Sequence, residues 1–332
     1  MAEETTFNLL ISSAGRRVAL LRSFRQGLVD LGLNGRVLAS DMGMASAAFN
    51  DADEGFVVPP CDDESFIPEL LRLCERERVH LVVPTIDPEL PKLAEHRQAF
   101  DDLGTTVAVS SSEVISIGAD KDATHRFLRA HSIPTVRQST PAEVLSHPVG
   151  WVFPLVMKPR RGSASIGVRV VSDPEDLAVA GVEDCIVQEL APGSEYTVDV
   201  LVDRNERLVC SVPRRRIEVR SGEVSKGVSV REPRILAVVD QVVAALPAPF
   251  GALTIQVFLD DSTGALSVIE LNPRFGGGFP LSWHAGARFP QWIIEGVAGL
   301  PSTAQSTSWR DGLVMLRWDD AVFVDAADIG LP

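Results

Sequence analysis

The chain has 332 residues, 45% of them apolar and 23% charged, which is enough for two or three units with continuous hydrophobic cores. Its net charge is −14 and its basic residues are scattered apart from one short run, which excludes the positive surface that nucleic-acid binding requires. No apolar stretch approaches the ~20 residues of a membrane span, and the four cysteines lack metal-ligand spacing, so we expect a cytoplasmic protein with reduced thiols and no membrane partner.

The first ~115 residues alternate short β-branched runs with amphipathic stretches, which is typical of parallel strands joined by helices. Apolar residues recur at three- and four-residue spacing over Val18–Leu31 and Ser65–Arg78, and this predicts two covering helices. The pattern indicates a doubly wound α/β domain. Its candidate strands are Phe7–Ser12, Arg36–Ser40, Gly55–Val58, His80–Pro84 and Thr106–Val109.

The turn Ser13–Arg17 follows the first candidate strand directly, at the edge of the sheet where such folds bind ligands. It is either a ligand-binding loop with two arginines or a tight turn with solvated arginines. A complete GxGxxG fingerprint is absent, so a nicotinamide-binding domain is only weakly supported.

A helix predicted from Gly118 to Val136 leads into a second region, where closely spaced strands indicate antiparallel sheets in α+β units. The two further helices of this region are predicted at Asp176–Ala180 and Glu232–Leu246. Its candidate strands are Leu155–Lys158, Val168–Val171, Cys185–Leu190, Tyr196–Val202, Leu208–Val219, Leu253–Leu259 and Leu266–Asn272.

The last of these strands carries the sharpest chemical signal, Glu270 and Asn272 in the run Ser267-Val-Ile-Glu-Leu-Asn-Pro-Arg274. In a strand both side chains project to one face, so two oxygen ligands stand side by side. Gln256 can add its carbonyl from a neighbouring strand. One carboxylate with one or two amide carbonyls suits Mg²⁺, which takes its other ligands from water and nucleotide phosphates. Arg274 and the glycines that follow it point to the same place.

A second candidate is Lys158, which lies on a short strand just before the small-residue loop Gly162–Gly167. A cation and unobstructed backbone amides can bind a polyphosphate, although the order differs from a Walker A loop. The alternative is a surface hairpin with an exposed lysine. Farther on, Glu195 is either a ligand of ribose hydroxyls or a solvated strand residue.

Arg214 and Arg216 share one face of a candidate strand and could hold a substrate carboxylate or phosphate. An edge strand protected by charge is the alternative. Gly276 and Gly277, in the glycine run after Arg274, are further candidates for substrate contact.

These segments, in this order, resemble the ATP-grasp superfamily, and most closely the small single-unit proteins similar to the large subunit of carbamoyl-phosphate synthase. The resemblance runs from Ser12–Arg17 through Asp120-Lys121 and Lys158 to Asn272-Pro-Arg-Phe-Gly-Gly-Gly278. It implies an N-terminal α/β domain at residues 1–115, a linker helix and lid subdomain at 116–190, and a C-terminal α+β domain at 191–332.

The resemblance also implies roles for individual residues. Arg274 would stabilise the oxyanions of the acyl phosphate and Glu195 would bind the ribose, while Gln188 stands where the family often has a glutamate that meets the adenine amino group. The other expected nucleotide contacts are made by Lys121, Lys158, the loop from Gly162 and Ser163 to Gly167, and the backbone of Glu189 and Leu190. Gln256, Glu270 and Asn272 would hold the metal.

The resulting hypothesis is an ATP-dependent ligase that activates a carboxylate, or a similar oxyanion, as an acyl phosphate for attack by an amine or another nucleophile. The expected cofactors are ATP and one or two Mg²⁺ ions, with Mn²⁺ able to substitute. The expected partners are small-molecule carboxylate and amine substrates, with a homodimer left open. The alternatives are a non-catalytic nucleotide-binding module, a phosphotransferase like carbamoyl-phosphate synthase and, least favoured, a nicotinamide oxidoreductase.

Overall fold

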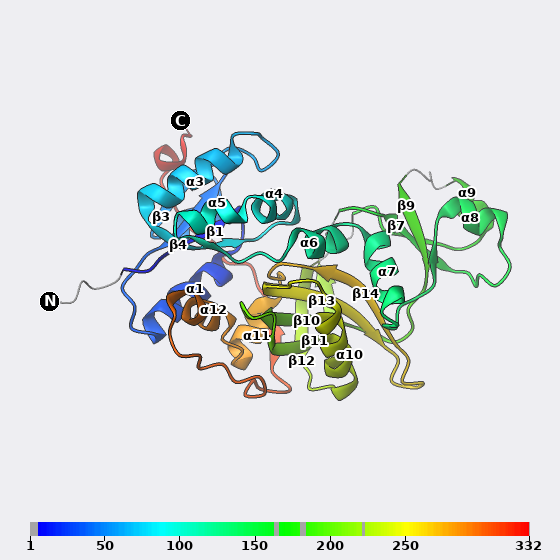
Figure 1. The fold of residues 1–332 in the computed structure, drawn as a ribbon. Coiled ribbons are helices and arrows are strands. Elements are labelled where there is room, and N and C mark those ends of the chain that lie inside the picture. The colour runs from blue at the N-terminus through cyan, green and yellow to red at the C-terminus, as the bar shows by residue number, and fades with distance from the viewer. Residues whose placement is uncertain (1–5, 163–165, 180–183, 221–222, 332) are drawn as a thin grey trace.

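The computed structural model of the chain describes residues 6–162, 166–179, 184–220 and 223–331, which form three β-sheets. Figure 1 shows the N-terminal sheet and the smallest sheet at opposite ends of the molecule. The first sheet is parallel and the other two are antiparallel, so the predicted combination of α/β and α+β units is confirmed.

Five parallel strands make up the N-terminal sheet: β1 (Asn8–Ser12), β2 (Val37–Asp41), β3 (Glu54–Val57), β4 (Val79–Pro84) and β5 (Thr106–Val107). Their order is β3-β2-β1-β4-β5. β1 is buried along its whole length, as expected of a strand whose sheet is covered on both faces. Because β1 lies between β2 and β4, the loops after β1 and β4 border a crevice at the carboxyl edge of the sheet.

The helices of this region are α1 (Val18–Asp30), α2 (Ala47–Asp51), α3 (Phe66–Glu77), η1 (Asp87–Glu89), α4 (Leu90–Glu95) and α5 (Arg97–Asp102). Successive side chains of β1 point to opposite faces of the sheet. Leu9 and Ile11 pack with α1, whereas Leu10 packs on the opposite face with α3 and α4. This alternation is the period of a strand buried on both sides.

Two helices, α6 (Ser112–Ala119) and α7 (Lys121–Ala130), connect the N-terminal sheet to the rest of the chain. The prediction of one helix from Gly118 to Val136 was therefore wrong. Asp120 breaks the helical path with extended dihedrals, and its carboxylate accepts a hydrogen bond from the backbone N–H of Asp122 at 2.9 Å. Asp120 is thus the N-cap of a new helix, a position that favours aspartate.

The smallest sheet has the order β6-β9-β7-β8, formed by β6 (Gln138–Ser139), β7 (Leu155–Pro159), β8 (Arg169–Val171) and β9 (Cys185–Glu189). Its helices are α8 (Pro141–Ser146) and α9 (Pro174–Val179). Val144, Leu155, Met157, Leu177 and Val187 form a small core of their own beneath this sheet. The smallest sheet therefore has a hydrophobic core separate from those of the other two sheets.

The largest sheet has the order β14-β13-β10-β11-β12-β15. Its strands are β10 (Ser194–Val202), β11 (Leu208–Arg220), β12 (Glu223–Ser229), β13 (Gly251–Leu259), β14 (Leu266–Asn272) and β15 (Val314–Leu316). The remaining helices are α10 (Pro233–Ala245), α11 (Phe279–Ala285), α12 (Phe289–Ala298) and η2 (Ala326–Ile329). Val198 and Val200 of β10 face a core that includes α10, whereas Val212 of β11 lies in a core with α11 and α12.

One continuous core joins the N-terminal sheet to the largest sheet. Phe24 of α1 and Trp292 and Ile293 of α12 belong to it, together with Val212 of β11. The two helices approach closely, because a Cβ on Gly27 of α1 would stand 3.3 Å from the backbone of Gln291. These two parts of the chain therefore share buried surface.

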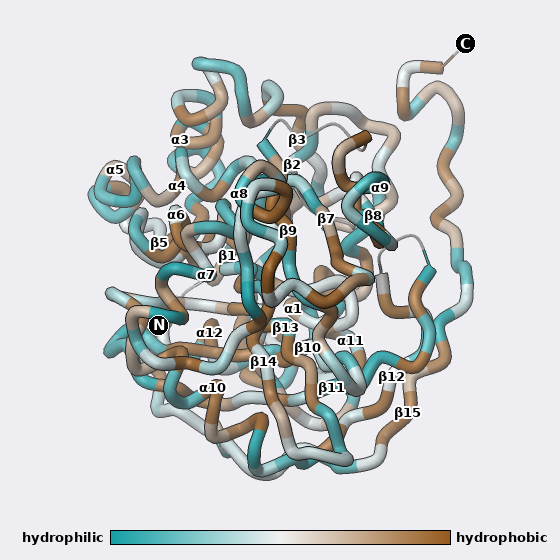
Figure 2. The backbone as a smooth tube through the Cα atoms, turned by 90° about the vertical axis from the view of Figure 1, so that its right-hand side faces the viewer, coloured by the Kyte–Doolittle hydropathy of each residue, from teal (hydrophilic) through white to brown (hydrophobic). Residues whose placement is uncertain are grey.

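The C-terminal segment after β15 links the same two parts. Figure 2 shows it running along the outside of the molecule from β15 to the C-terminus, and Figure 1 shows that it ends beside the N-terminal sheet. At that end Gly330 lies against Met44, where a Cβ would stand 3.5 Å from the methionine methyl group.

Candidate functional site

A cleft of about 270 Å³ lies between the smallest sheet and the largest sheet. It brings together most of the residues predicted to bind a nucleotide and a metal: Lys121, Lys158, Gly162, Gln188, Glu189, Leu190, Glu195, Gln256 and Glu270. Ser163 lies outside the described residues.

Lys158 projects from β7 into this cleft with 6% of its surface exposed. Burial lowers its pKa to about 8, while the carboxylates of Glu270 and Glu195 oppose the shift and the ammonium of Lys121 adds to it. An anionic ligand would stabilise both ammonium groups in their charged form. The surroundings of Lys158 therefore suit phosphate oxygens.

The predicted metal ligands lie on neighbouring strands of the largest sheet. Gln256 of β13 and Glu270 of β14 are direct partners in the antiparallel register, and both line the cleft. The amide of Asn272 donates a hydrogen bond to the Glu270 carboxylate at 3.2 Å, which leaves its carbonyl oxygen as an acceptor. One carboxylate and two amide carbonyls form the oxygen-rich donor set that Mg²⁺ takes when a nucleotide supplies further ligands, so these residues fit that ion.

A chain of amides fixes the side chain of Gln188. Its Nε2 donates to Oε1 of Gln138 at 2.8 Å, and Nε2 of Gln138 in turn donates to the carboxylate of Asp122 at 3.3 Å. The carboxylate can only accept, so it sets the orientation of both amides. Gln188 is buried and keeps its carbonyl oxygen as an acceptor for an amino group in the cleft.

The segment that follows β7 is tied to α7. The Nζ of Lys121 donates to the carbonyl oxygen of Gly162 at 2.8 Å, and the backbone N–H of Lys121 donates to the carbonyl oxygen of Arg160 at 3.0 Å. Gly162 has a φ of +101°, a backbone conformation that residues with a side chain rarely adopt. The glycine therefore permits the turn that leads from β7 toward the cleft.

The two arginines predicted to hold a substrate have different surroundings. Arg216 contacts the carboxylate of Glu195 and lines the small cleft. Arg214 is buried, with 1% of its side chain exposed, and makes a bidentate pair with Asp199 at 2.6 and 2.9 Å. Ser282 of α11 also donates to Asp199 at 2.5 Å. Asp199 thus links Arg214 to Ser282 of α11. The proposed contact of Arg214 with a substrate stays a prediction.

Arg274 lies two residues after Asn272, the last of the predicted metal ligands. Its side chain extends toward the N-terminal sheet. Its Nη2 donates to the carboxylate of Asp87, the first residue of η1, at 2.6 Å. Its Nε is buried, and among the described residues it has no hydrogen-bond partner. A guanidinium with one edge held by Asp87 and a buried N–H still to be satisfied is suited to a further oxyanion.

A larger cavity of about 1150 Å³ begins on the other side of this ion pair. Thr85 and Ile86 line it just before Asp87 in the chain, and Gly276 and Gly277 line it just after Arg274. The structure therefore places both glycines that the sequence marked for substrate contact in this cavity, beside the turn Ser13–Arg17.

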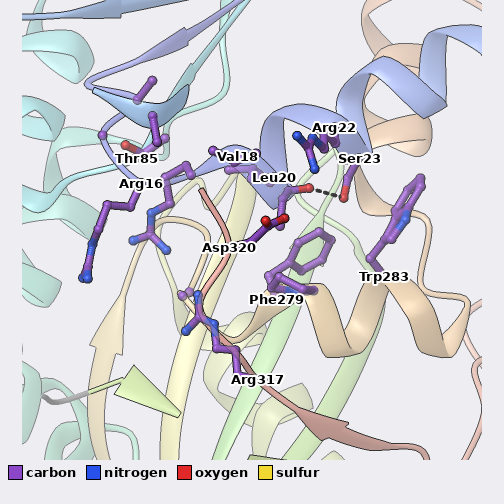
Figure 3. A pocket seen from close by; sticks show the side chains of 18 of the residues that line it. Arg16, Val18, Leu20, Arg22, Ser23, Thr85, Phe279, Trp283, Arg317 and Asp320 are labelled. Carbon is purple, nitrogen blue, oxygen red and sulfur yellow. Dashed lines mark hydrogen bonds between the residues drawn. The ribbon is translucent and has the colours of Figure 1, made fainter. Parts of the chain in front are cut away.

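Figure 3 shows how side chains reach this space. Arg16 approaches from the turn after β1, and Arg317 approaches from the C-terminal segment on the opposite wall. Phe279 and Trp283 extend from α11. The cavity thus lies where the N-terminal sheet, α11 and the C-terminal segment meet.

Comparison with known families agrees with this arrangement. Residues 9–108 match the family described as PylC-like, N-terminal domain, and residues 118–278 match the family described as ATP-grasp domain. The chain belongs to the ATP-grasp superfamily. The resemblance on which the sequence prediction rested is therefore confirmed.

Curated relatives match parts of this ATP-grasp chain. It is 26% identical over 198 residues to the D-alanine–D-alanine ligase of Lacticaseibacillus casei (strain BL23), covering 55% of the chain and 52% of the ligase. It is 24% identical over 188 residues to the carbamoyl phosphate synthase large chain of Bifidobacterium animalis subsp. lactis (strain AD011), covering 50% of the chain and 16% of that protein. The chain thus spans about half the length of the ligase and a smaller share of the synthase.

Among solved structures, the biotin carboxylase domain of Hydrogenobacter thermophilus 2-oxoglutarate carboxylase matches with a TM-score of 0.73 and 17% identity. The match covers 93% of the ATP-grasp chain and 74% of that domain, which was crystallised with MgADP, ADP and bicarbonate. This similarity establishes a shared ATP-grasp fold.

Several residues in or beside the two cavities were not predicted from the sequence. Asp199 interrupts the apolar strand β10, and a charged residue in such a strand is a signal that a buried partner exists. Asp87, Trp283 and Arg317 have no comparable signal, because their places beside the cavities depend on contacts between distant segments.

In the described part of the chain, no helix has the length and apolar character of a membrane span.

Proposed function

We propose that this ATP-grasp protein is an ATP-dependent ligase, which converts a carboxylate or similar oxyanion into an acyl phosphate that an amine or another nucleophile attacks. The observation that carries the proposal is the run from Glu270 to Gly277. Glu270 lies with Lys158 in the small cleft, Arg274 pairs with Asp87, and Gly277 lines the large cavity. A nucleotide compartment and a substrate compartment are thus joined within eight residues of chain.

In this proposal Lys158 and Lys121 bind phosphate oxygens, Glu195 accepts hydrogen bonds from ribose hydroxyls, and the carbonyl of Gln188 accepts one from the adenine amino group. The backbone of Glu189 and Leu190 at the end of β9 borders the same ring. These positions support the proposal because a buried cation, a carboxylate and a fixed acceptor line one cleft. Phosphoryl transfer depends mainly on such positioning and charge.

Gln256, Glu270 and Asn272 would hold Mg²⁺ in this scheme. The ion neutralises charge on the transferred phosphoryl group when it is bound. Arg274 would donate to the oxygens of the acyl group, where negative charge develops as the nucleophile attacks. The mixed anhydride reacts directly with the nucleophile, so the mechanism requires no nucleophilic side chain.

A non-catalytic nucleotide-binding module is a less favoured alternative. Such a module would need Lys158 and Glu195, whereas Glu270, Asn272 and Arg274 would have no function in it.

The ligase proposal also includes one or two Mg²⁺ ions with Mn²⁺ able to substitute, a cytoplasmic location, a possible homodimer, and domain boundaries at residues 115 and 190.

The test is to trap the acyl phosphate. The protein is incubated with Mg-ATP, pools of small carboxylates and hydroxylamine, which converts an acyl phosphate into a hydroxamate with release of phosphate. We expect hydroxamate and ADP in equal amounts from at least one acid, and neither product from the Glu270→Ala variant. Formation of ADP without hydroxamate, at the same rate with and without every acid, would refute the ligase assignment.

A further inference from the structure

We propose that Ser13 and Glu89 form a proton relay at the edge of the large cavity, which takes the proton from the attacking nucleophile in the second step of the reaction. This inference rests on the proposed ligase function and adds to it the base for acyl transfer.

Glu89, the last residue of η1, is a carboxylate with no exposed surface. Its Oε2 accepts hydrogen bonds from the hydroxyls of Ser12 at 2.6 Å and Ser13 at 2.9 Å. Its Oε1 accepts from the backbone N–H groups of Thr85 at 2.7 Å and Ile86 at 3.1 Å. Burial raises the pKa of this carboxyl, and the hydrogen bonds from these neutral donors oppose the shift only in part. A carboxylate with a raised pKa is better suited to accept a proton near neutral pH.

Ser13 connects this carboxylate to the cavity. Ser13, Thr85 and Ile86 line the cavity, whereas Ser12 has no exposed surface. The amide N–H groups of Thr85 and Ile86 can only donate, but a hydroxyl can accept one hydrogen bond while it donates another. The Ser13 hydroxyl can therefore accept a proton from a group in the cavity while it passes its own proton to Glu89.

The backbone of Ser13 has a conformation that serine rarely adopts. Its φ is +49°, in the left-handed region that is unfavourable for residues with a side chain. Thr85 stabilises this turn, because its hydroxyl donates to the carbonyl oxygens of Ser12 at 3.1 Å and Ser13 at 2.7 Å. A glycine would adopt the same φ without strain but would lack the hydroxyl. A strained serine at a cavity, bonded to a buried carboxylate, is typical of a functional position.

The same short helix η1 also carries Asp87, two residues before Glu89. Asp87 pairs with Arg274 at 2.6 Å, and Ile86, which precedes it, lines the cavity. One element thus fixes both the group that would accept the proton and the partner of the group that would stabilise the oxyanion. Attack by the nucleophile needs both at once, so their fixed separation favours a role in the same step.

The proposed step is balanced as follows. The nitrogen of a neutral amine forms a bond to the carboxyl carbon of the acyl phosphate, and the C–O bond to phosphorus breaks at carbon, so that its electron pair leaves with inorganic phosphate. One N–H proton passes to Oγ of Ser13 while the hydroxyl proton of Ser13 passes to Oε2 of Glu89. Glu89 ends as a carboxylic acid and returns its proton through the same hydroxyl to water in the cavity.

Two other titratable side chains lie beside Glu89. Asp87 is held by Arg274. The pKa of the Cys61 thiol is raised, first by burial and then by the charge of Glu89. The thiol therefore stays protonated over the range in which a glutamate titrates.

Three variants separate the relay from a purely structural role. Ser13→Gly removes the relay hydroxyl and suits the positive φ. Ser12→Ala is the matched control, because it removes the other hydroxyl that donates to the same Oε2 but that lies away from the cavity. Glu89→Gln can keep all four contacts, since its carbonyl oxygen accepts from the two N–H groups and its amide donates to the two hydroxyls, yet it cannot take up the proton.

Each protein is assayed with Mg-ATP and an acid found by the hydroxamate screen, once with hydroxylamine and once with a pool of amino acids as amines. Hydroxylamine attacks an acyl phosphate without help from a base, so hydroxamate formation reports the first step alone. We expect it to stay within about threefold of the parent in all three variants. Amide formation should fall about 100-fold or more in Ser13→Gly and Glu89→Gln, the scale of lost base catalysis, and stay within about threefold in Ser12→Ala.

The outcomes distinguish the relay from the ligase assignment. Equal losses of amide formation in Ser13→Gly and Ser12→Ala would mean that the hydroxyls only hold Glu89 in place, and the inference would fail. Amide formation at the parent's rate in Ser13→Gly or Glu89→Gln would overturn it as well. Hydroxamate formation by the parent does not depend on the relay, so its absence with every acid refutes the ligase assignment instead.

Infrared titration of Glu89 tests the inference without turnover. The C=O band of its protonated carboxyl is identified by its loss in Glu89→Gln. We expect this band to appear at a higher pH than that of an ordinary glutamate, and at a still higher pH in both Ser12→Ala and Ser13→Gly, because each hydrogen bond stabilises the ionised form. A Glu89 that titrates at or below the ordinary value would exclude the relay and leave the ligase function standing.

Discussion

A methyl group added at Gly278 would strike the guanidinium of Arg214. An ideal Cβ at this position would stand 2.2 Å from Nη1 and 2.9 Å from Cζ of Arg214, well inside van der Waals contact. The backbone of Gly278 itself has φ −88° and ψ 2°, which alanine can adopt. The penalty of Gly278→Ala therefore comes from the collision and not from backbone strain.

The size of the effect follows from the surroundings of Arg214. The guanidinium has 1% of its side chain exposed and is held by two hydrogen bonds to Asp199, so it cannot move away without breaking a buried ion pair. Loss of such a pair costs about 3–5 kcal/mol, and a shift of the glycine turn that relieves part of the collision lowers this. We expect Gly278→Ala to reduce the free energy of unfolding by about 3 kcal/mol.

The assay is urea denaturation followed by circular dichroism, with Gly296→Ala as the control. Gly296 lies in α12, has open space around its Cα and has no positive φ, so alanine there should raise stability by about 0.4–1 kcal/mol. In an Arg214→Met background the penalty of Gly278→Ala should shrink to under about 1 kcal/mol, because the colliding atoms are gone. An equal penalty in both backgrounds would refute the reasoning.

The remaining predictions concern the nucleotide cleft. Glu270→Ala and Asn272→Ala should each lower turnover at limiting Mg²⁺ by at least about 100-fold, because each removes an oxygen ligand, while the circular dichroism spectrum is unchanged; near-normal turnover would exclude them as metal ligands. Arg274→Lys should bind ATP within a few-fold of the parent while kcat falls by roughly 10²–10³, the scale of one lost oxyanion donor; weaker ATP binding with unchanged single-turnover chemistry would make Arg274 a nucleotide ligand instead. Because the pKa of Lys158 is lowered to about 8, the folded protein loses this proton before the unfolded chain does. Stability should therefore rise between pH 8 and pH 10 by about 1 kcal/mol per pH unit, and Lys158→Met, measured by urea denaturation at both pH values, should remove this rise. The same slope in the variant would show that another group is responsible.

Much of the fold could be predicted because its elements carry local patterns. The parallel strands and both amphipathic helices of the first sheet lie within one or two residues of their predicted limits. The break between α6 and α7 at Asp120 was missed, because the apolar pattern continues across it. Asp120 ends that path as the N-cap of α7, and its carboxylate pairs with Arg160 at 2.5 Å. Helices α11 and α12 were missed although each has a proline in its first turn, a position that begins helices, and Gly286 and Gly299 end them with positive φ.

The site could be predicted only where its residues are close in sequence or share a strand register. Glu270 and Asn272 form a pattern that is legible in seven residues of one strand. The pair between Asp87 and Arg274 joins residues 187 positions apart, and the contact between Arg214 and Gly278 joins two motifs that the sequence presents as unrelated. Such pairings follow from the packing of α11 and the N-terminal sheet, which a single sequence does not specify locally.

The core shared by α1 and α12 bears on how the protein can be divided for study. Trp292 and Ile293 of α12 belong to the same core as Phe24 of α1, and they lie beyond residue 278, where the ATP-grasp family match ends. A fragment cut at that limit would expose an aromatic and aliphatic face of α1 to water, and such faces promote aggregation. The smallest sheet, whose apolar side chains form their own cluster, contributes none of its described residues to this shared core. The natural unit for truncation and chimera experiments is therefore larger than the family match.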